Sequence, residues 1–213
     1  MTATARPRAL FDDDRTGFIY RTAARIIYEK GFDATSMSEI AEALDLTKPG
    51  LYYYVKGKKE LLFSIMQFAM NLLDSEVVEP SKVIGDPEER LEIIIRQHAR
   101  LLTHDEAGAL AILIDEDAGL SDEHRDEIVN RKRAYFEYLR LTLEELRSRG
   151  RLRPLDSTVA AFSLLGMVMW IARWYDPKGR LAGERVVQDV TEIALAGMLS
   201  AESSKPISLA QAL

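Results

Sequence analysis

A run of fourteen residues in the first third of the chain combines amines and hydroxyls with no acidic residue. The run covers 46–59, and its polar side chains are Thr47, Lys48, Tyr52, Tyr53, Tyr54, Lys56, Lys58 and Lys59. Ammonium and hydroxyl groups are those that proteins use to contact the phosphate oxygens of a duplex. The run therefore predicts a small basic surface suited to a nucleic acid.

The charge of the whole chain hides this surface. The net charge is −6, but residues 1–60 contain ten Lys/Arg against nine Asp/Glu, and the rest contains eighteen against twenty-five. Phosphate contacts need positive potential only where they are made. The distribution predicts a duplex-binding N-terminal part on an acidic remainder.

Two short helices must position these groups. Ser36 precedes an apolar-periodic segment and is followed three residues later by Glu39, which is the spacing of a capping box. Thr47 is suited to cap a second helix, in which Pro49 is tolerated in the first turn. Gly50 lets the backbone approach a partner closely. Two short helices joined by a tight turn predict a helix-turn-helix, whose second helix enters a major groove.

The rest of the chain is also patterned as helices, and the fold class expected is all-α with about nine helices. Helical spacing predicts further elements at about 87–104, 106–117, 122–149, 156–175 and 184–200. The expected organisation is a flexible arm at 1–14, a helix-turn-helix domain at 15–60, an effector-binding and dimerisation domain at 61–200, and a polar tail at 201–213. Arg6 and Arg8 of the arm, and Arg15 directly after it, could reach a minor groove, although a disordered tail is favoured for the first two.

Several classes of protein are not favoured by the sequence. There is no cysteine, so thiolate metal sites and disulfides are absent. The longest apolar run, 159–172, is shorter than the roughly 20 residues of a membrane span. No signal-peptide core precedes the three aspartates at 12–14. We expect a cytoplasmic protein without a membrane partner.

The stretch from Gly31 to Leu61 resembles the signature of the tetracycline-repressor (TetR) family. The matching features are Gly31, the hydroxyl cap, Ile40-Ala41, Leu51-Tyr52, an aromatic residue and Lys58-x-x-Leu61. The resemblance implies phosphate contacts for Tyr52, Tyr54 and Lys58. It implies base contacts for the positions before the Leu-Tyr pair, and the full DNA-binding set expected is Ser36, Thr47, Lys48, Pro49, Gly50, Tyr52, Tyr53, Tyr54 and Lys58. Val55 departs from the phenylalanine common in the family, which we expect to change packing only.

The same resemblance implies a homodimer that binds a palindromic operator in double-stranded DNA. The family dimerises through its last two long helices, expected here at 156–175 and 184–200. The second has an apolar stripe that we expect at the interface: Val187, Val190, Thr191, Ala194 and Met198.

A small hydrophobic effector is the other partner that the resemblance implies, and no cofactor is expected. The segment 170–179 is similar to the end of this helix in family members that respond to acyl-CoA thioesters. A drug or aromatic compound is the alternative effector. The expected effector-binding residues are Leu113, Phe136, Leu139, Leu165, Met169, Trp170, Arg173 and Trp174. Most of these would look the same in a plain hydrophobic core.

Three other hypotheses stay open. His98, His104 and His124, with the acidic run 115–117, could suggest a metal, but a spacing of six puts His98 and His104 on different faces of a helix. Satisfied histidines and solvated acids are favoured instead, and no metal is expected. A helical enzyme lacks any supporting motif, such as a glycine-rich phosphate loop. A DNA-binding protein without an effector would have no ligand site in its second domain.

Overall fold

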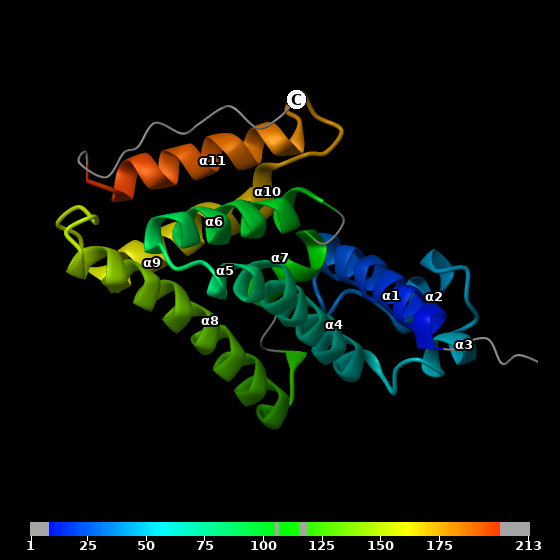
Figure 1. Ribbon diagram of the computed structural model, residues 1–213. Helices are drawn as coiled ribbons and strands as arrows, with labels where there is room; N and C mark the ends of the chain where they lie inside the picture. Colours follow the sequence, from blue (N-terminus) through cyan, green and yellow to red (C-terminus); the bar gives the residue numbers. More distant parts are fainter. Residues whose placement is uncertain (1–8, 105–106, 116–118, 201–213) are drawn as a thin grey trace, which may run out of the picture. The chain divides into compact units, whose positions relative to one another are not determined.

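The computed structural model describes residues 9–104, 107–115 and 119–200, and these are helical almost throughout (Figure 1). The expected all-α class is confirmed. Within these ranges no strand forms, and one isolated antiparallel bridge joins Leu152 and Leu199. The chain divides into two compact units, which we call the head (described residues up to 72, and 107–130) and the body (73–104 and 131–200).

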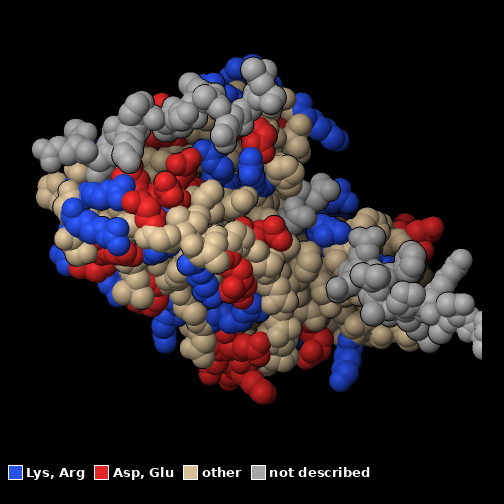
Figure 2. Space-filling view, in the orientation of Figure 1, with Lys and Arg blue, Asp and Glu red and all other residues tan. Residues whose placement is uncertain are grey.

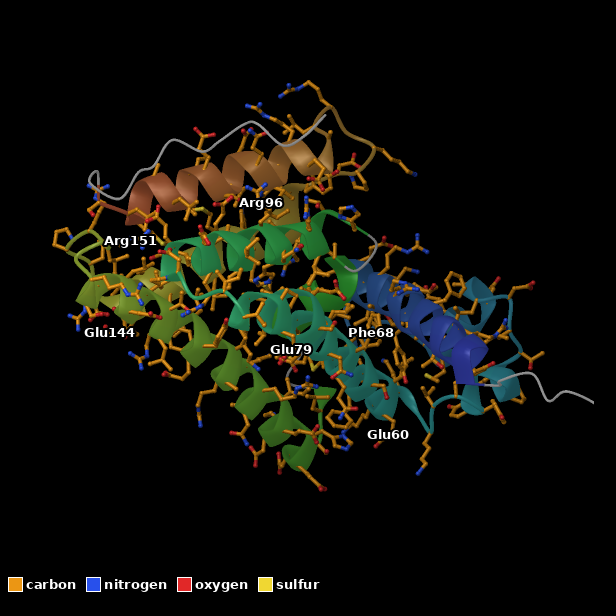
Figure 3. All side chains as sticks on the ribbon, viewed as in Figure 1. Glu60, Phe68, Glu79, Arg96, Glu144 and Arg151 are labelled. Carbon is orange, nitrogen blue, oxygen red and sulfur yellow. The ribbon has the colours of Figure 1, made fainter. Side chains whose placement is uncertain are left out.

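The head is built on three helices that pack against one another: α1 (Ala9–Lys30), α4 (Lys58–Leu72) and α7 (Ala107–Asp115). The short helices α2 (Met37–Ala43) and α3 (Lys48–Tyr52) pack together, and α2 also contacts α1 (Figure 1). Phe68 of α4, labelled in Figure 3, meets Tyr20 of α1 with ring centroids 5.8 Å apart. The start of α8 (Asp122–Ser148) completes this unit.

The body surrounds one central helix, α6 (Pro87–Thr103). Helix α11 (Gly183–Met198) runs along it (Figure 1), and α9 (Ser157–Met169), α10 (Ile171–Trp174), α5 (Glu79–Lys82) and the π-helix η1 (Leu73–Val78) also contact it. Leu91, Ile94 and Leu102 of α6 are almost fully buried. The central position of α6 makes its inward side chains the interior of the body.

Acidic N-caps and ion pairs fix the ends of the body helices. Asp86 accepts hydrogen bonds from the N–H groups of Glu88 (2.8 Å) and Glu89 (3.2 Å) at the start of α6. Arg151, labelled in Figure 3, binds the Asp86 carboxylate at 2.6 Å and also pairs with Glu88. This guanidinium holds the pKa of Asp86 at about 2. Basic and acidic side chains are accordingly interspersed over the visible face of the body (Figure 2).

The structure differs from the sequence predictions at several boundaries. Helix α1 begins at Ala9, so the arm expected over 1–14 overlaps it; residues 1–8, with Arg6 and Arg8, and the tail 201–213 lie outside the described residues. Segments η1 and α5 continue α4 through Pro80, where a loop was expected. The helix expected at 156–175 is interrupted at Trp170, and α7 belongs to the head.

Two segments have the length and composition of a membrane span, Lys58–Lys82 and Ser157–Trp174. More than half of the first is buried (56%), as in the core helix of a soluble protein, but only 33% of the second is buried. The second includes the apolar run 159–172. Because most of this apolar segment is exposed in a single chain, we expect another surface to cover it.

Candidate nucleic-acid interface

The segment from Ser36 to Tyr54 folds as two short helices joined by a tight turn. Helix α2 ends at Ala43, and the N–H of Leu46 donates to the carbonyl of Ala41 at 2.8 Å. Asp45 has a φ of +53°, a left-handed conformation in which aspartate and asparagine are enriched. Helix α3 then begins at Lys48. The turn has the short length that a helix-turn-helix requires.

Neutral hydroxyl groups cap both helices. Ser36 Oγ accepts from the N–H of Glu39 at 3.2 Å, and Thr47 Oγ1 accepts from the N–H of Gly50 at 3.1 Å. A Cβ on Gly50 would lie 3.1 Å from Thr47 Oγ1 and would crowd this cap. Glycine therefore protects the cap in addition to leaving the backbone open.

The three tyrosines divide between the surface and the core because their neighbours supply the buried face. Leu51 and Val55 are 0% and 5% exposed and anchor the segment to the head. Tyr52 and Tyr53 are exposed, at 43% and 78%, whereas Tyr54 is half-buried with its ring edge-on to that of Tyr53. The large exposed side chains of Tyr52 and Tyr53 are available to a partner.

Two lysines of this surface differ in their exposure and in their contacts with the rest of the chain. Lys48 is exposed and has no ion pair among the residues that the structure describes. Lys58 is half-buried; its Nζ donates to the carbonyl of Asp33 at 3.2 Å and lies 4.4 Å from the ring centroid of Phe32. An ammonium has three N–H donors, so this anchoring still leaves donors for a phosphate. Sequence reasoning did not foresee the anchor, because Asp33 contributes only its backbone.

An open groove of about 430 Å³ runs beside the turn, lined by Ser38, Ala41, Glu42, Asp45, Leu46, Thr47 and Lys48. The carboxylates of Glu42 and Asp45 are exposed there. Two carboxylates disfavour an anion, so the groove does not suit a phosphate. The exposed side of α3, with Lys48 and Tyr52, suits it better.

Most of the residues expected at a dimer interface are buried within their own chain. Val187, Thr191, Ala194 and Met198 are 0–6% exposed, because this stripe of α11 lies on the side that packs against α6, and Val190 is half-buried. The stripe therefore has a cover within its own chain, and its place at a dimer interface stays a prediction. An apolar stripe shows that a helix is covered, but not whether its own chain or a second copy covers it.

The expected effector-binding residues do not form one set in the interior. Leu139 is fully buried in the body, Leu165 and Met169 are half-buried, and Phe136 contacts Phe162 with centroids 4.4 Å apart. Trp170, Arg173 and Trp174 are exposed, and Leu113 is buried in the head. Trp170, at 63% exposure, lies on the surface of the single chain. Which of these residues contact an effector stays a prediction.

The three histidines lie in separate environments. His124 stacks on Phe63 at 3.7 Å, and His104 Nδ1 lies 2.7 Å from the carbonyl of Arg100. His98 is 2% exposed, with Nδ1 2.9 Å from the hydroxyl of Tyr135. No group of three or more metal-ligating side chains forms among the described residues. Sequence reasoning favoured a satisfied histidine over a metal ligand at this position; it did not single out His98 as the one histidine on the apolar face of α6.

A capped α2–turn–α3 unit with exposed tyrosine and lysine side chains defines the class of this protein as a helix-turn-helix DNA-binding protein. The family model described as "Bacterial regulatory proteins, tetR family" matches residues 19–65, and "Tetracyclin repressor-like, C-terminal domain" matches residues 85–198, more than half of the chain. The chain belongs to the tetR family of bacterial regulatory proteins. It is a transcriptional regulator and not an enzyme.

Similar proteins include solved structures and a curated repressor. AibR, crystallised in complex with isovaleryl coenzyme A and operator DNA, is 38% identical with a TM-score of 0.75, covering 84% of this chain and 97% of that one. PfmR from Thermus thermophilus is 29% identical with a TM-score of 0.74, over 84% and 97%. The transcriptional repressor KstR2 of Mycobacterium tuberculosis is 23% identical over 87% of this chain and 94% of its own length.

Proposed function

We propose that this chain is a ligand-responsive repressor that binds a palindromic operator as a homodimer and is released by a small hydrophobic effector. The observation that carries the proposal is the exposed side of α3, with Lys48, Tyr52 and Tyr53, in the segment that matches the family's DNA-binding domain. The proposal places the protein in the cytoplasm with its operator. No membrane takes part.

The exposed groups suggest which residues contact bases and which contact phosphates. Lys48 is long, exposed and near the start of α3, so we assign it to base edges, together with Thr47 and Tyr53. Tyr52, Tyr54 and Lys58 contact phosphates, where a hydroxyl or ammonium donor at a fixed place sets the register. Ser36, Pro49 and Gly50 contribute by shaping the surface and by close backbone approach.

The homodimer is assigned to the face of α9 and α11 that points away from the body interior. Val159, Phe162 and Trp170 are 61–63% exposed on one side, and Ile193 of α11 is 61% exposed. Gly166 and Gly197 are exposed on the same helices, and a Cβ at either would meet no described atom within 4 Å, so another backbone can approach closely there. A second copy presenting the same face would cover this apolar surface. Each copy would then present one α3 to one operator half-site.

An acyl-CoA thioester is the effector class that we favour. AibR, at 38% identity, was crystallised with isovaleryl coenzyme A and operator DNA together. Another hydrophobic small molecule, such as a drug or an aromatic compound, is the second candidate. In either case the effector must bind the DNA-free conformation more tightly than the DNA-bound one, because only differential affinity shifts an equilibrium.

Binding-site selection from random duplex DNA tests the proposal. The full-length protein should enrich a palindrome, and Lys48→Ala should change the bases selected near the centre of each half-site. Lys178→Ala, which removes an exposed lysine of the body, is the matched control and should leave the consensus unchanged. Failure to enrich any palindrome at low salt would refute the proposal.

Release is tested separately on the selected operator. Isovaleryl-CoA should lower operator occupancy at fixed protein concentration, whereas free coenzyme A should not. Release by aromatic compounds and not by any acyl-CoA would favour the second candidate. Stable occupancy in the presence of every class of hydrophobic molecule would instead favour a regulator without an effector.

A further inference from the structure

The body holds one buried polar side chain whose hydrogen bonding is incomplete. The other polar residues buried there each have a partner for the side-chain oxygen: Ser81, Thr103, Thr142, Ser157 and Thr191. His98 is 2% exposed, and its Nε2 has no hydrogen-bond partner among the described residues. Leaving a buried donor or acceptor unpaired costs free energy, so such a group calls for an explanation.

The hydrogen bond at Nδ1 defines which atom is left over. Tyr135 Oη lies 2.9 Å from His98 Nδ1, and Tyr135 is itself only 7% exposed. The hydroxyl hydrogen of Tyr135 has no other acceptor among the described residues, so the hydroxyl donates to Nδ1. A neutral imidazole that accepts at Nδ1 carries its proton at Nε2. Burial favours the neutral state by lowering the pKa of His98 to about 4, and it raises the pKa of Tyr135, which stays a donor.

The surroundings of this N–H donor are apolar. On α6 the residues one turn before and after His98 are Ile94, Ile95, Leu101 and Leu102, all buried. Leu139, one turn along α8 from Tyr135, is fully buried. The π-helix η1, a rare element found often at functional sites, packs against α6. A single oriented donor among apolar side chains is what a small-molecule site uses to fix a hydrophobic ligand.

We propose that Nε2–H of His98, oriented by the Tyr135 hydroxyl, donates a hydrogen bond to the carbonyl oxygen of the effector's acyl group. The proposal rests on the proposed function and deepens it by naming the residues that recognise the effector's polar atom. A thioester carbonyl is a neutral acceptor, so it suits a neutral imidazole in an apolar interior. A free carboxylic acid offers the same acceptor from another source.

The test compares two probes that differ in one oxygen atom. Isovaleryl-CoA carries the carbonyl, and S-(3-methylbutyl)-CoA is the thioether in which that carbonyl is a methylene. The full-length protein should bind the first roughly three- to tenfold more tightly in calorimetry, the range expected for one net hydrogen bond. Isovalerate is the third probe; binding of isovalerate with no binding of isovaleryl-CoA would assign the acyl group to a free acid.

Two variants separate recognition from packing. The double variant H98L/Y135F removes both members of the pair, and it should bind the two CoA probes equally, with the affinity of the wild type for the thioether. Tyr138→Phe is the matched control: it lies one turn from Tyr135 on α8, and it breaks the 2.8 Å hydrogen bond to Ser81. Tyr138→Phe should keep the full preference for the carbonyl.

Melting and spectroscopy give readouts that do not depend on affinity. Removing both partners of a hydrogen bond is close to neutral, so H98L/Y135F should melt within a few degrees of the wild type or above it. The chain has three histidines, so the Nε2–H of His98 can be assigned in a proton–nitrogen spectrum. The chemical shift of this Nε2–H proton should change on adding isovaleryl-CoA and should not change on adding the thioether.

The outcomes against the proposal are distinct. A double variant that keeps the carbonyl preference, or a His98 signal that neither CoA probe nor isovalerate moves, overturns it and leaves the pair structural, with a bound water on Nε2. The same follows if the wild type binds both CoA probes equally. Operator binding in the same samples without probe reports separately on the proposed DNA-binding function.

Discussion

The head and the body cap their helices with different chemistry. Ser36, Thr47 and Ser121 cap helices of the head with hydroxyl oxygens. Asp86 and Asp156 cap helices of the body with carboxylates, each of which accepts two backbone N–H groups. A hydroxyl and a carboxylate stabilise a helix start about equally well. A carboxylate beside DNA, however, repels phosphates, so the neutral caps of the head are consistent with its proposed partner.

The interiors differ as well. Among the described residues of the head, the buried polar side chains are Thr22 and Thr35, and neither titrates. The body buries His98 with an unpaired nitrogen. We therefore expect the stability of the body to depend on pH and, through the proposed effector, on a ligand, whereas that of the head should depend on apolar packing around residues such as Leu51. The predictions below test this contrast, in order of decreasing effect.

The largest expected effect concerns the apolar face that we assign to the dimer. Ile193→Arg should give a monomer by light scattering and lower operator affinity about 100-fold or more, because the second half-site then loses its high effective concentration. Leu141→Arg is the control, since it adds the same charge at an apolar position of α8 that is 55% exposed. A dimer that persists in Ile193→Arg would show that another surface pairs the two copies.

The second prediction concerns the interior of the body. Between pH 7 and pH 5 the unfolded imidazole of residue 98 takes up a proton at a pKa near 6.5, whereas the folded one, with a pKa of about 4, does not. The unfolded state then binds more protons, so stability is complete above pH 6.5 and falls as the pH is lowered toward 4. The loss from pH 7 to pH 5 should be about 2 kcal/mol.

The variant H98L/Y135F provides the comparison, measured by urea unfolding at one protein concentration. It should lack this part of the pH dependence. If the plots of unfolding free energy against pH were parallel for the variant and the wild type, His98 would take up its proton in the folded state as it does in the unfolded state.

The third prediction exchanges the cap chemistry of the two regions. Thr47→Asp keeps a capping oxygen, so the melting temperature should stay equal or rise, because a negative charge is favourable at a helix N-terminus. Operator affinity should fall about tenfold, which one added repulsion of about 1.4 kcal/mol explains. Thr47→Asn is the neutral control and should bind within about twofold of the wild type. Equal binding by the two variants would place Thr47 away from the DNA.

The smallest expected effect concerns Lys58. Lys58→Ala should reduce the slope of log affinity against log salt by about 0.9, the value for one phosphate contact. Lys178→Ala should leave the slope unchanged. A lower melting temperature with an unchanged slope would instead mean that the ammonium serves only Asp33 and Phe32.

The sequence was sufficient to predict the elements whose ends have local signals. Ser36, Thr47 and Pro49 define α2 and α3 because capping depends on residues three positions apart, and both caps form as expected. The π-helix η1 could not be predicted, since its hydrogen bonds leave no distinctive spacing of residue types. The inward stripe of α11 was visible, but its partner, α6, lies far away along the chain. The Tyr135–His98 contact is long-range in the same way.

The absence of a side chain at Gly50 affects how much an operator can encode. Each base pair in a site is constrained only as far as a side chain distinguishes it from the alternatives. If α3 lies in the major groove, the base pair facing Gly50 meets backbone alone, and it carries little information. The protein would then tolerate a family of related operators that differ at that position, which suits one regulator controlling several promoters.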